Sequence, residues 1–233
     1  MRLSGTVVAE ASTLVEDGSV VVEGDRIVAV GERETLGEQY PDHREVTADV
    51  VMPGMVGAHI HSVQSLGRGT AEDRELLAET GTHVTHCPSS SMKLASGVAP
   101  VVDYLDREIN VALGNDGLPC NNTLDPFTEM KQASTLQKVD RLGSTVTPAA
   151  AIFEMATSNG AKAAGFEQVG KLREGWRAAI IGLSTATTRA TPLYDVLSHL
   201  VFAARGEDVT FTMVDGEMLM EDGEVTVADA DAI

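Results

Sequence analysis

Strand-like and helix-like segments alternate between Met55 and Asp116, and this alternation constrains the fold more than any other feature of the chain. The strand-like runs are "MVGAHIH", "THVTHCP" and "INVALGND", and the helix-like segments between them are "AEDRELLAET" and "APVVDYLDRE". Strands that alternate with helices form parallel sheets, because each helix returns the chain to the same end of the sheet. The sequence therefore predicts an α/β fold with a parallel sheet or barrel.

Both ends of the chain have a different residue pattern, which is typical of short strands joined by tight turns. Residues 1–52 contain β-branched runs separated by "EDG" and "EGD", and the chain closes with "DVTFTMVDGEMLMEDGEVT". Such runs between glycine and acidic residues indicate antiparallel strands. We predict a composite β-domain from residues 1–52 and 206–233, with residues 53–205 inserted as a separate α/β domain.

Two longer helices and a return to strands are expected after Asp116. The first helix covers "LDPFTEMKQASTLQKV" and begins at Asp125 and Pro126, since Asp is a favoured helix cap and Pro a favoured first residue. The second covers "TPAAAIFEMATSNGAKAAG", and the segment "VGKLREGWRAAIIGL" is expected to form strands.

Charge and composition exclude several classes of partner. The chain has 233 residues, with 35 acidic against 17 basic side chains and a formal net charge of −18, which repels nucleic acids and anionic membranes. Its apolar runs are shorter than the ~20 residues that span a bilayer, and its N-terminus lacks a signal-peptide core. Two cysteines fit a reducing compartment. We expect a soluble cytoplasmic protein; the acidic excess fits either a high-salt habitat or an ordinary acidic protein.

His59 and His61 are candidate metal ligands. Two residues apart in a strand, they project from the same face and can reach one ion. Imidazole nitrogen suits zinc, and catalytic zinc sites use about three protein ligands with an open position for water. The alternative is a chance pair in an exposed strand. Their place at the end of the first α/β strand favours the metal site, because barrel enzymes keep their active sites there.

Asp116 and His86 are the other candidate site residues. Asp116 lies at the corresponding end of another strand, where a carboxylate can ligate a metal and accept a proton from its water. The alternative is a turn or helix-capping aspartate. His86 ends the strand in "THVTHCPSSS", whereas His83 is expected to be an ordinary core or surface histidine. Cys87 is interpreted as a small buried apolar residue without a lowered thiol pKa.

Several motifs in order resemble the amidohydrolase superfamily, in particular its methylthioadenosine/S-adenosylhomocysteine deaminases and s-triazine chlorohydrolases. The motifs are "VMPGMVGAHIHS", "LLAETGTHVTHCPSSSMKLASGVAPV", "LGNDGLPCNNTLDPFTEMKQASTLQKV", "MATSNGAKAAGF" and "TPLYDVLSHLVFAARGEDV". The resemblance runs through nearly the whole chain. It implies a (β/α)8 TIM-type barrel with a β-sandwich domain built from both termini, and one divalent metal, zinc or iron, at the barrel mouth.

The resemblance also assigns roles to the candidate residues. His59 and His61 match the paired metal ligands, Asp116 matches the aspartate that binds the metal and shuttles the proton, and His86 matches the histidine that orients the hydrolytic water and contacts substrate. The implied activity is deamination of an aminopurine nucleoside, such as methylthioadenosine or S-adenosylhomocysteine, or of a related heterocycle by a homo-oligomer. The alternatives are s-triazine dechlorination, guanine-type deamination, or an inactive remnant that serves as a binding or assembly module.

The chain departs from the family pattern in one large respect. The family's third histidine ligand and the following glutamate have no counterpart, and the segment from Met55 to Arg205 has about 150 residues where eight βα units need ~250. About four units are therefore missing near residues 69–71. Either the printed sequence contains only the ordered residues of a longer protein and omits an internal segment, or the gene product lacks strands two to five. Two smaller departures are Ser91 in place of asparagine and Ala179 in place of aspartate.

Overall fold

The structure, a computed structural model, describes residues 1–58 and 74–227. The chain divides into two compact units, one formed by Met1–Gly54 with Glu167–Ile233 and the other by Met55–Phe166. This division puts residues 167–205 in the unit that contains both chain ends, whereas the sequence analysis placed them in the α/β domain. The reason is that β7 (Ile180–Leu183) pairs with strands from both ends of the chain.

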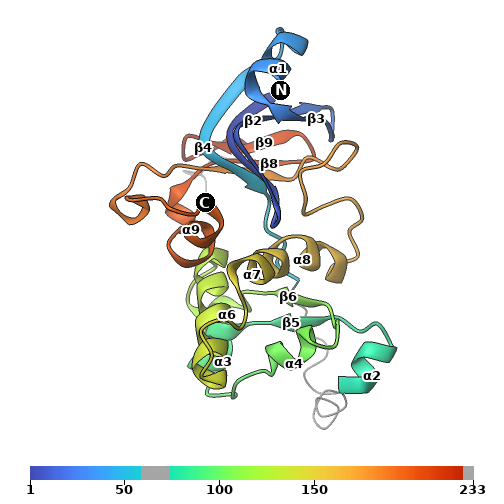
Figure 1. Cartoon of the computed structure of the whole chain (residues 1–233), viewed down its shortest axis with the longest axis vertical. Helices are drawn as coiled ribbons and strands as arrows, with labels where there is room; N and C mark the ends of the chain where they lie inside the picture. The colour runs from blue at the N-terminus through green and yellow to red at the C-terminus, as the bar shows by residue number, and fades with distance from the viewer. Residues whose placement is uncertain (59–73, 228–233) are drawn as a thin grey trace. The chain divides into compact units, whose positions relative to one another are not determined.

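One sheet of eight strands organises the first unit (Figure 1). Its order is β10-β9-β8-β7-β4-β1-β2-β3. Besides β7, the strands are β1 (Arg2–Glu10), β2 (Thr13–Glu23), β3 (Arg26–Glu32), β4 (Glu45–Pro53), β8 (Val209–Val214), β9 (Glu217–Glu221) and β10 (Glu224–Val225). Among the described strands of this sheet, β1 and β4 form the one parallel pair, and the other neighbours are antiparallel. The two ends of the chain meet where β4 pairs with β7, in a register that sets Val50 opposite Leu183.

The sheet is strongly curved. Gly216, in the turn between β8 and β9, adopts a φ of +78°, and a Cβ at this position would overlap the carbonyl oxygen of Gly24 in the turn between β2 and β3. The β8–β9 turn and the β2–β3 turn, which are far apart in the strand order, therefore lie in contact. Only a glycine at position 216 allows this close approach. Buried side chains from six strands form one core, including Leu3, Val20, Ile27, Val51, Ile180 and Phe211. The division of this sheet into the two layers of a sandwich stays a prediction.

A short helix, α1 (Arg33–Gln39), interrupts the region that the sequence analysis interpreted as strands alone. Its buried Leu36 packs against Val21 and Ala29 in a small separate cluster. A single apolar residue gives too weak a helical period to be recognised in the sequence. In the same unit, α9 (Val196–Phe202) begins at Asp195, whose carboxylate accepts a hydrogen bond from the Ser198 amide at 2.7 Å.

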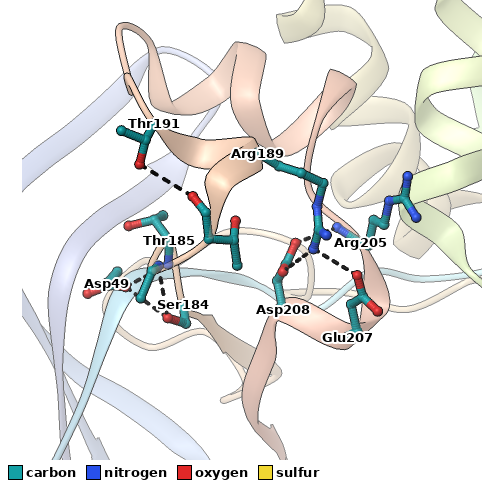
Figure 2. Close-up of polar contacts among 10 residues, drawn as sticks. Asp49, Ser184, Thr185, Arg189, Thr191, Arg205, Glu207 and Asp208 are labelled. Carbon is teal, nitrogen blue, oxygen red and sulfur yellow. Dashed lines mark hydrogen bonds and ion pairs between the residues drawn. The ribbon is translucent and has the colours of Figure 1, made fainter.

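Two groups of polar contacts hold the segment between β7 and α9, one to β4 and the other to the 3-10 turn before β8 (Figure 2). Oδ2 of Asp49, on β4, accepts hydrogen bonds from the Thr185 amide at 2.6 Å and the Ser184 hydroxyl at 3.1 Å. Further along, Arg189 pairs with Asp208 at 2.6 Å and with Glu207 at 2.8 Å. The residues of this second group lie in two short 3-10 turns, Thr188–Ala190 and Gly206–Asp208.

Two parallel strands lie at the centre of the second unit, β5 (Val84–His86) and β6 (Val111–Leu113). Their register sets Val84 opposite Val111 and His86 opposite Leu113, which confirms the parallel pairing predicted from the alternation of strands and helices. The helices of this unit are α2 (Arg74–Glu79), α3 (Pro88–Lys93), α4 (Val101–Leu105), α5 (Leu118–Asn121), α6 (Pro126–Arg141), α7 (Ala149–Ala156) and α8 (Ser158–Ala163). Closure into an eight-stranded barrel stays a prediction.

The backbone just before the predicted histidine pair lies beside β6. The Ala58 amide donates to the carbonyl oxygen of Leu113 at 3.2 Å, and the Val56 amide donates to the carbonyl oxygen of Ala156 at 2.9 Å. A Cβ at position 160 would overlap the carbonyl of Val56, so a glycine there allows α8 to approach this backbone. The segment 55–58 is therefore held against β6 and the helices that follow it.

The predicted helix starts are partly confirmed. Asp125 caps α6, since its carboxylate accepts from the Phe127 amide at 3.0 Å and the Thr128 hydroxyl at 2.9 Å. The single helix expected after Thr147 is divided into α7 and α8 at Thr157, whose φ of −119° and ψ of −94° are not helical. No helix among residues 1–58 and 74–227 has the length and apolar character needed to cross a membrane.

Candidate active site

The segments that follow β5 and β6 leave the small parallel sheet at the same end. His86 is the last residue of β5, and its carbonyl oxygen accepts a hydrogen bond from the Gly114 amide, just beyond β6, at 3.0 Å. Asp116 follows in the segment that leads to α5. Because the strands are parallel, their carboxyl ends bring His86 and Asp116 to one edge of the sheet.

His86 is 2% exposed, and its Nε2 atom has no hydrogen-bond partner among the described residues. Burial disfavours the imidazolium ion and lowers the pKa of His86 from 6.5 to about 4. The ring is therefore neutral at neutral pH. An unpaired buried nitrogen is costly, so Nε2 is suited to a hydrogen bond with a water molecule or a ligand.

Asp116 is 9% exposed and adopts a φ of +62°, a conformation that few residues other than glycine adopt. Its Oδ1 atom accepts a hydrogen bond from the Gly117 amide at 2.7 Å, and its Oδ2 atom accepts one from the buried hydroxyl of Ser90. Ser90 belongs to α3, directly after β5. The Asp116 carboxylate is thus held in position by hydrogen bonds from the segment after β5 and from the segment after β6.

Glu129, in the first turn of α6, contacts the same two segments and was not among the residues predicted from the sequence. It is 1% exposed, and its carboxylate accepts hydrogen bonds from the Ser89 amide at 3.2 Å, the Ser89 hydroxyl and Nδ2 of Asn121 at 2.9 Å. The sequence contains one indication that Glu129 is buried, which is its spacing. Glu129, Ala133 and Gln137 lie four residues apart and so share one buried face of the helix. A carboxylate on a buried face requires compensating donors.

Of the two other residues interpreted as structural, His83 lies at the surface, which is one of its two predicted settings, whereas Cys87 is half-buried rather than fully buried. Burial, the largest cause, together with the carboxylates of Asp116 and Glu129, raises the pKa of the Cys87 thiol to about 12. Cys87 is therefore a protonated thiol at neutral pH. His83 is exposed just before β5, at the opposite end of the strand from His86.

The predicted metal ligands His59 and His61 lie outside the described residues. Within residues 1–58 and 74–227 there is no group of three or more His, Cys, Asp or Glu side chains that could hold a metal ion. The described residues offer two possible donors to a metal ion, the carboxylate of Asp116 and the Nε2 atom of the neutral His86 imidazole. This Nε2 atom has no hydrogen-bond partner among the described residues. Oxygen and imidazole nitrogen donors of this kind fit zinc or iron. The assignment of His59, His61 and Asp116 as one metal site stays a prediction.

Comparison with known proteins identifies similar sequences. A sequence model described as "Amidohydrolase family" matches residues 69–219, and one described as "Imidazolonepropionase-like composite domain, bacteria" matches residues 20–42. The chain is 49% identical to a 5'-deoxyadenosine deaminase of Methanosarcina mazei over 67% of this chain and 36% of that protein. It is 45% identical to a 5-methylthioadenosine/S-adenosylhomocysteine deaminase of Haloarcula marismortui over 68% of this chain and 37% of that protein. The chain thus spans less than half the length of these relatives.

Solved structures share the fold. An adenosine deaminase from Xanthomonas campestris with bound zinc superposes with a TM-score of 0.90 at 19% identity, covering 99% of this chain and 95% of that chain. A mutant atrazine chlorohydrolase from Arthrobacter aurescens, complexed with zinc and atraton, gives a TM-score of 0.80 at 13% identity, covering 99% and 97%. Since the family model matches well over half of the sequence, and relatives named as adenosine-type deaminases match at 45–49% identity, this chain belongs to the amidohydrolase family.

Proposed function

We propose that this protein is a metal-dependent aminohydrolase that deaminates an adenine nucleoside carrying a modified 5' position. The candidate substrates are methylthioadenosine, S-adenosylhomocysteine and 5'-deoxyadenosine, which are the compounds in the names of the relatives. The observation that carries the proposal is the placement of His86 and Asp116 at one edge of a parallel strand pair, with Ser90 bonded to the Asp116 carboxylate. The same fold and family support a (β/α)8 barrel as the complete architecture.

The reaction replaces the exocyclic amino group of the purine by oxygen. Water adds to the ring carbon, the carbon–nitrogen bond breaks, and the amino group leaves as ammonia with a proton taken from the water. In this proposal Asp116 accepts that proton and returns it to the leaving nitrogen, and the hydrogen bonds from Ser90 and Gly117 that fix its carboxylate support this role. His86, neutral because of its burial, offers Nε2 to the water or to the substrate ring.

A divalent ion held by His59, His61 and Asp116, zinc or iron, would supply Lewis acidity that lowers the pKa of a water molecule. The donor types fit such an ion, and the structure of a zinc-containing adenosine deaminase shares this fold. Metal content measured by plasma mass spectrometry on the purified protein tests this part of the proposal. A stoichiometry near one per chain supports it, and its loss in His59→Ala and His61→Ala variants assigns the ligands.

Ammonia release tests the activity. The purified protein is incubated with 5'-deoxyadenosine, methylthioadenosine and S-adenosylhomocysteine, and in parallel with guanine and with atrazine, for which chloride is measured. The proposal expects ammonia from the adenine nucleosides and no release of chloride. Asp116→Asn and His86→Asn should reduce turnover at least about 100-fold. The matched control is Asp106→Asn, because Asp106 is an exposed aspartate of the same unit.

One observation favours a second candidate, a binding or assembly module without catalytic activity. The chain spans only 36–37% of the length of the relatives compared above, and the sequence has no counterpart of the third histidine ligand that the family resemblance implies. A purified chain that contains no metal and releases no ammonia from any of the nucleosides would support this candidate against the enzyme. Size-exclusion chromatography with light scattering tests the homo-oligomer that the family resemblance predicts.

A further inference from the structure

We infer that Glu129 is a positioning residue, which holds the two segments that carry His86 and Asp116 in one fixed arrangement. This inference rests on the proposed function, because it gives a role to a residue that supports the candidate site without touching substrate. Glu129 comes from neither segment. It projects from the first turn of α6, a separate helix of sixteen residues.

The first contact reaches the segment after β5. Both the amide and the hydroxyl of Ser89 donate to the Glu129 carboxylate, and the side-chain amide of Gln132 also contacts that hydroxyl. Ser89 directly precedes Ser90, whose hydroxyl donates to Asp116. A shift of the Glu129 carboxylate therefore moves the donor that orients Asp116.

The second contact reaches the segment after β6. Nδ2 of Asn121 donates to Glu129 at 2.9 Å and also to the carbonyl oxygen of Asn115 at 2.5 Å. Asn115 directly precedes Asp116, which adopts the uncommon φ of +62°. An unfavourable backbone conformation persists only where its surroundings hold it, and Asn121 fixes the peptide on one side of it.

The chemistry of Glu129 suits this task better than that of any neutral residue. Three donors from two separate segments point at one carboxylate, which is acceptor-only when ionised and has enough lone pairs for all of them. Oε1 accepts from the Ser89 hydroxyl and from Asn121, and Oε2 accepts from the Ser89 amide. Glutamine has one acceptor oxygen and an amide NH2 group, so in either orientation the NH2 group would face a donor, either Nδ2 of Asn121 or the Ser89 amide. The first turn of a helix also favours a negative side chain.

Hydrogen exchange measured by mass spectrometry tests the positioning role without using activity. The variants are Glu129→Ala and Glu129→Gln, and the matched control is Glu154→Gln, because Glu154 is an exposed glutamate on α7 of the same unit. Glu129→Ala should raise exchange about 10-fold in peptides 87–95 and 114–123, with little change in 149–156. Glu129→Gln should raise it less, and Glu154→Gln should leave it unchanged. Exchange that is unaltered in both segments, or raised equally in 149–156, would overturn the inference.

Kinetics of the full protein provide the second readout. Glu129→Ala should lower kcat for the best nucleoside substrate about 10- to 100-fold while KM changes less than about 3-fold, and Glu129→Gln should recover part of kcat. A change confined to KM, or equal losses in the alanine and glutamine variants, would contradict positioning. If the unmodified chain shows no turnover, the proposed function fails, and the exchange experiment still decides whether Glu129 holds the two segments.

Discussion

The hydroxyl of Ser90 donates a hydrogen bond to Oδ2 of Asp116, and this bond joins the segment after β5 to the segment after β6. Both side chains are buried. A hydrogen bond to a buried carboxylate fixes the direction of that oxygen, and the Gly117 amide holds the other oxygen, Oδ1, at 2.7 Å. The candidate site therefore depends on two segments rather than on one loop.

Replacement of Ser90 by alanine tests this bond. Ser90→Ala removes the donor to Asp116 but leaves the backbone of α3 intact, so we expect about a 10-fold loss of kcat in the ammonia-release assay and about 1 kcal/mol loss of unfolding free energy. The control is Ser96→Ala, because Ser96 is exposed on the same connection. Equal turnover in the two variants would show that the Ser90 hydroxyl does not orient Asp116.

The burial of His86 predicts a stability that falls in mild acid. The pKa of His86 is lowered from 6.5 to about 4, so between these values the unfolded chain binds a proton that the folded chain does not. Stability is therefore complete above pH 6.5 and is lost as the pH falls towards 4, by roughly 2–3 kcal/mol from this residue. The measurement is the free energy of urea unfolding from pH 4.5 to 7.5.

The contribution of His86 is isolated by a comparison with His86→Asn, which does not titrate in this range. Several carboxyl groups with lowered pKa values, including Glu10, Glu45 and Asp215, also destabilise the folded chain in acid, but they do so in both proteins. The difference between the two proteins should thus change with pH. A difference that stays constant from pH 4.5 to 7.5 would contradict the neutral buried imidazole.

The thiol of Cys87 should be unreactive in the folded protein. Burial raises its pKa to about 12, and the thiolate is the form that reacts with alkylating reagents. In a Cys120→Ser variant, which leaves Cys87 as the single thiol, we expect iodoacetamide at pH 8 to react about 100-fold more slowly than in 8 M urea. Similar rates with and without urea would mean that Cys87 is accessible and ionised.

The contact of Arg189 with Asp208 should be important for the stability of the first unit (Figure 2). Asp208 is buried and also accepts a hydrogen bond from the Arg205 amide at 2.9 Å, so its removal leaves that amide without its acceptor and Arg189 paired with Glu207 alone. We expect Asp208→Ala to lower the unfolding free energy by about 3 kcal/mol. The single tryptophan, Trp176, belongs to the same unit, and its fluorescence reports the transition.

The neighbouring Glu207 supplies a matched control for this experiment. Glu207 also pairs with Arg189, at 2.8 Å, but its side chain is 64% exposed. Ion pairs in water contribute little, so Glu207→Gln should change the unfolding free energy by less than about 0.5 kcal/mol. Equal effects of the two substitutions would show that burial does not distinguish the two carboxylates.

Local patterns in the sequence were sufficient for many of the elements. The parallel pairing of β5 and β6 follows from strands separated by a helix, and the start of α6 follows from the Asp125-Pro126 pair. The positions of His86 and Asp116 at strand ends follow from where the apolar runs stop. Each of these depends on residues close together in the chain, and their spacing is visible without a structure.

Partners far apart in the chain were decided only by the tertiary structure. The pairing of β4 with β7 joins residues more than a hundred positions apart and moves residues 167–205 into the first unit. Helices α7 and α8 divide at Thr157, where the backbone of Val56 packs against Gly160. The bonds from Ser89 and Asn121 to Glu129 likewise depend on three separate elements meeting. A sequence pattern records the period and polarity of a segment, but the partner of a buried polar group is set by the packing of the whole unit.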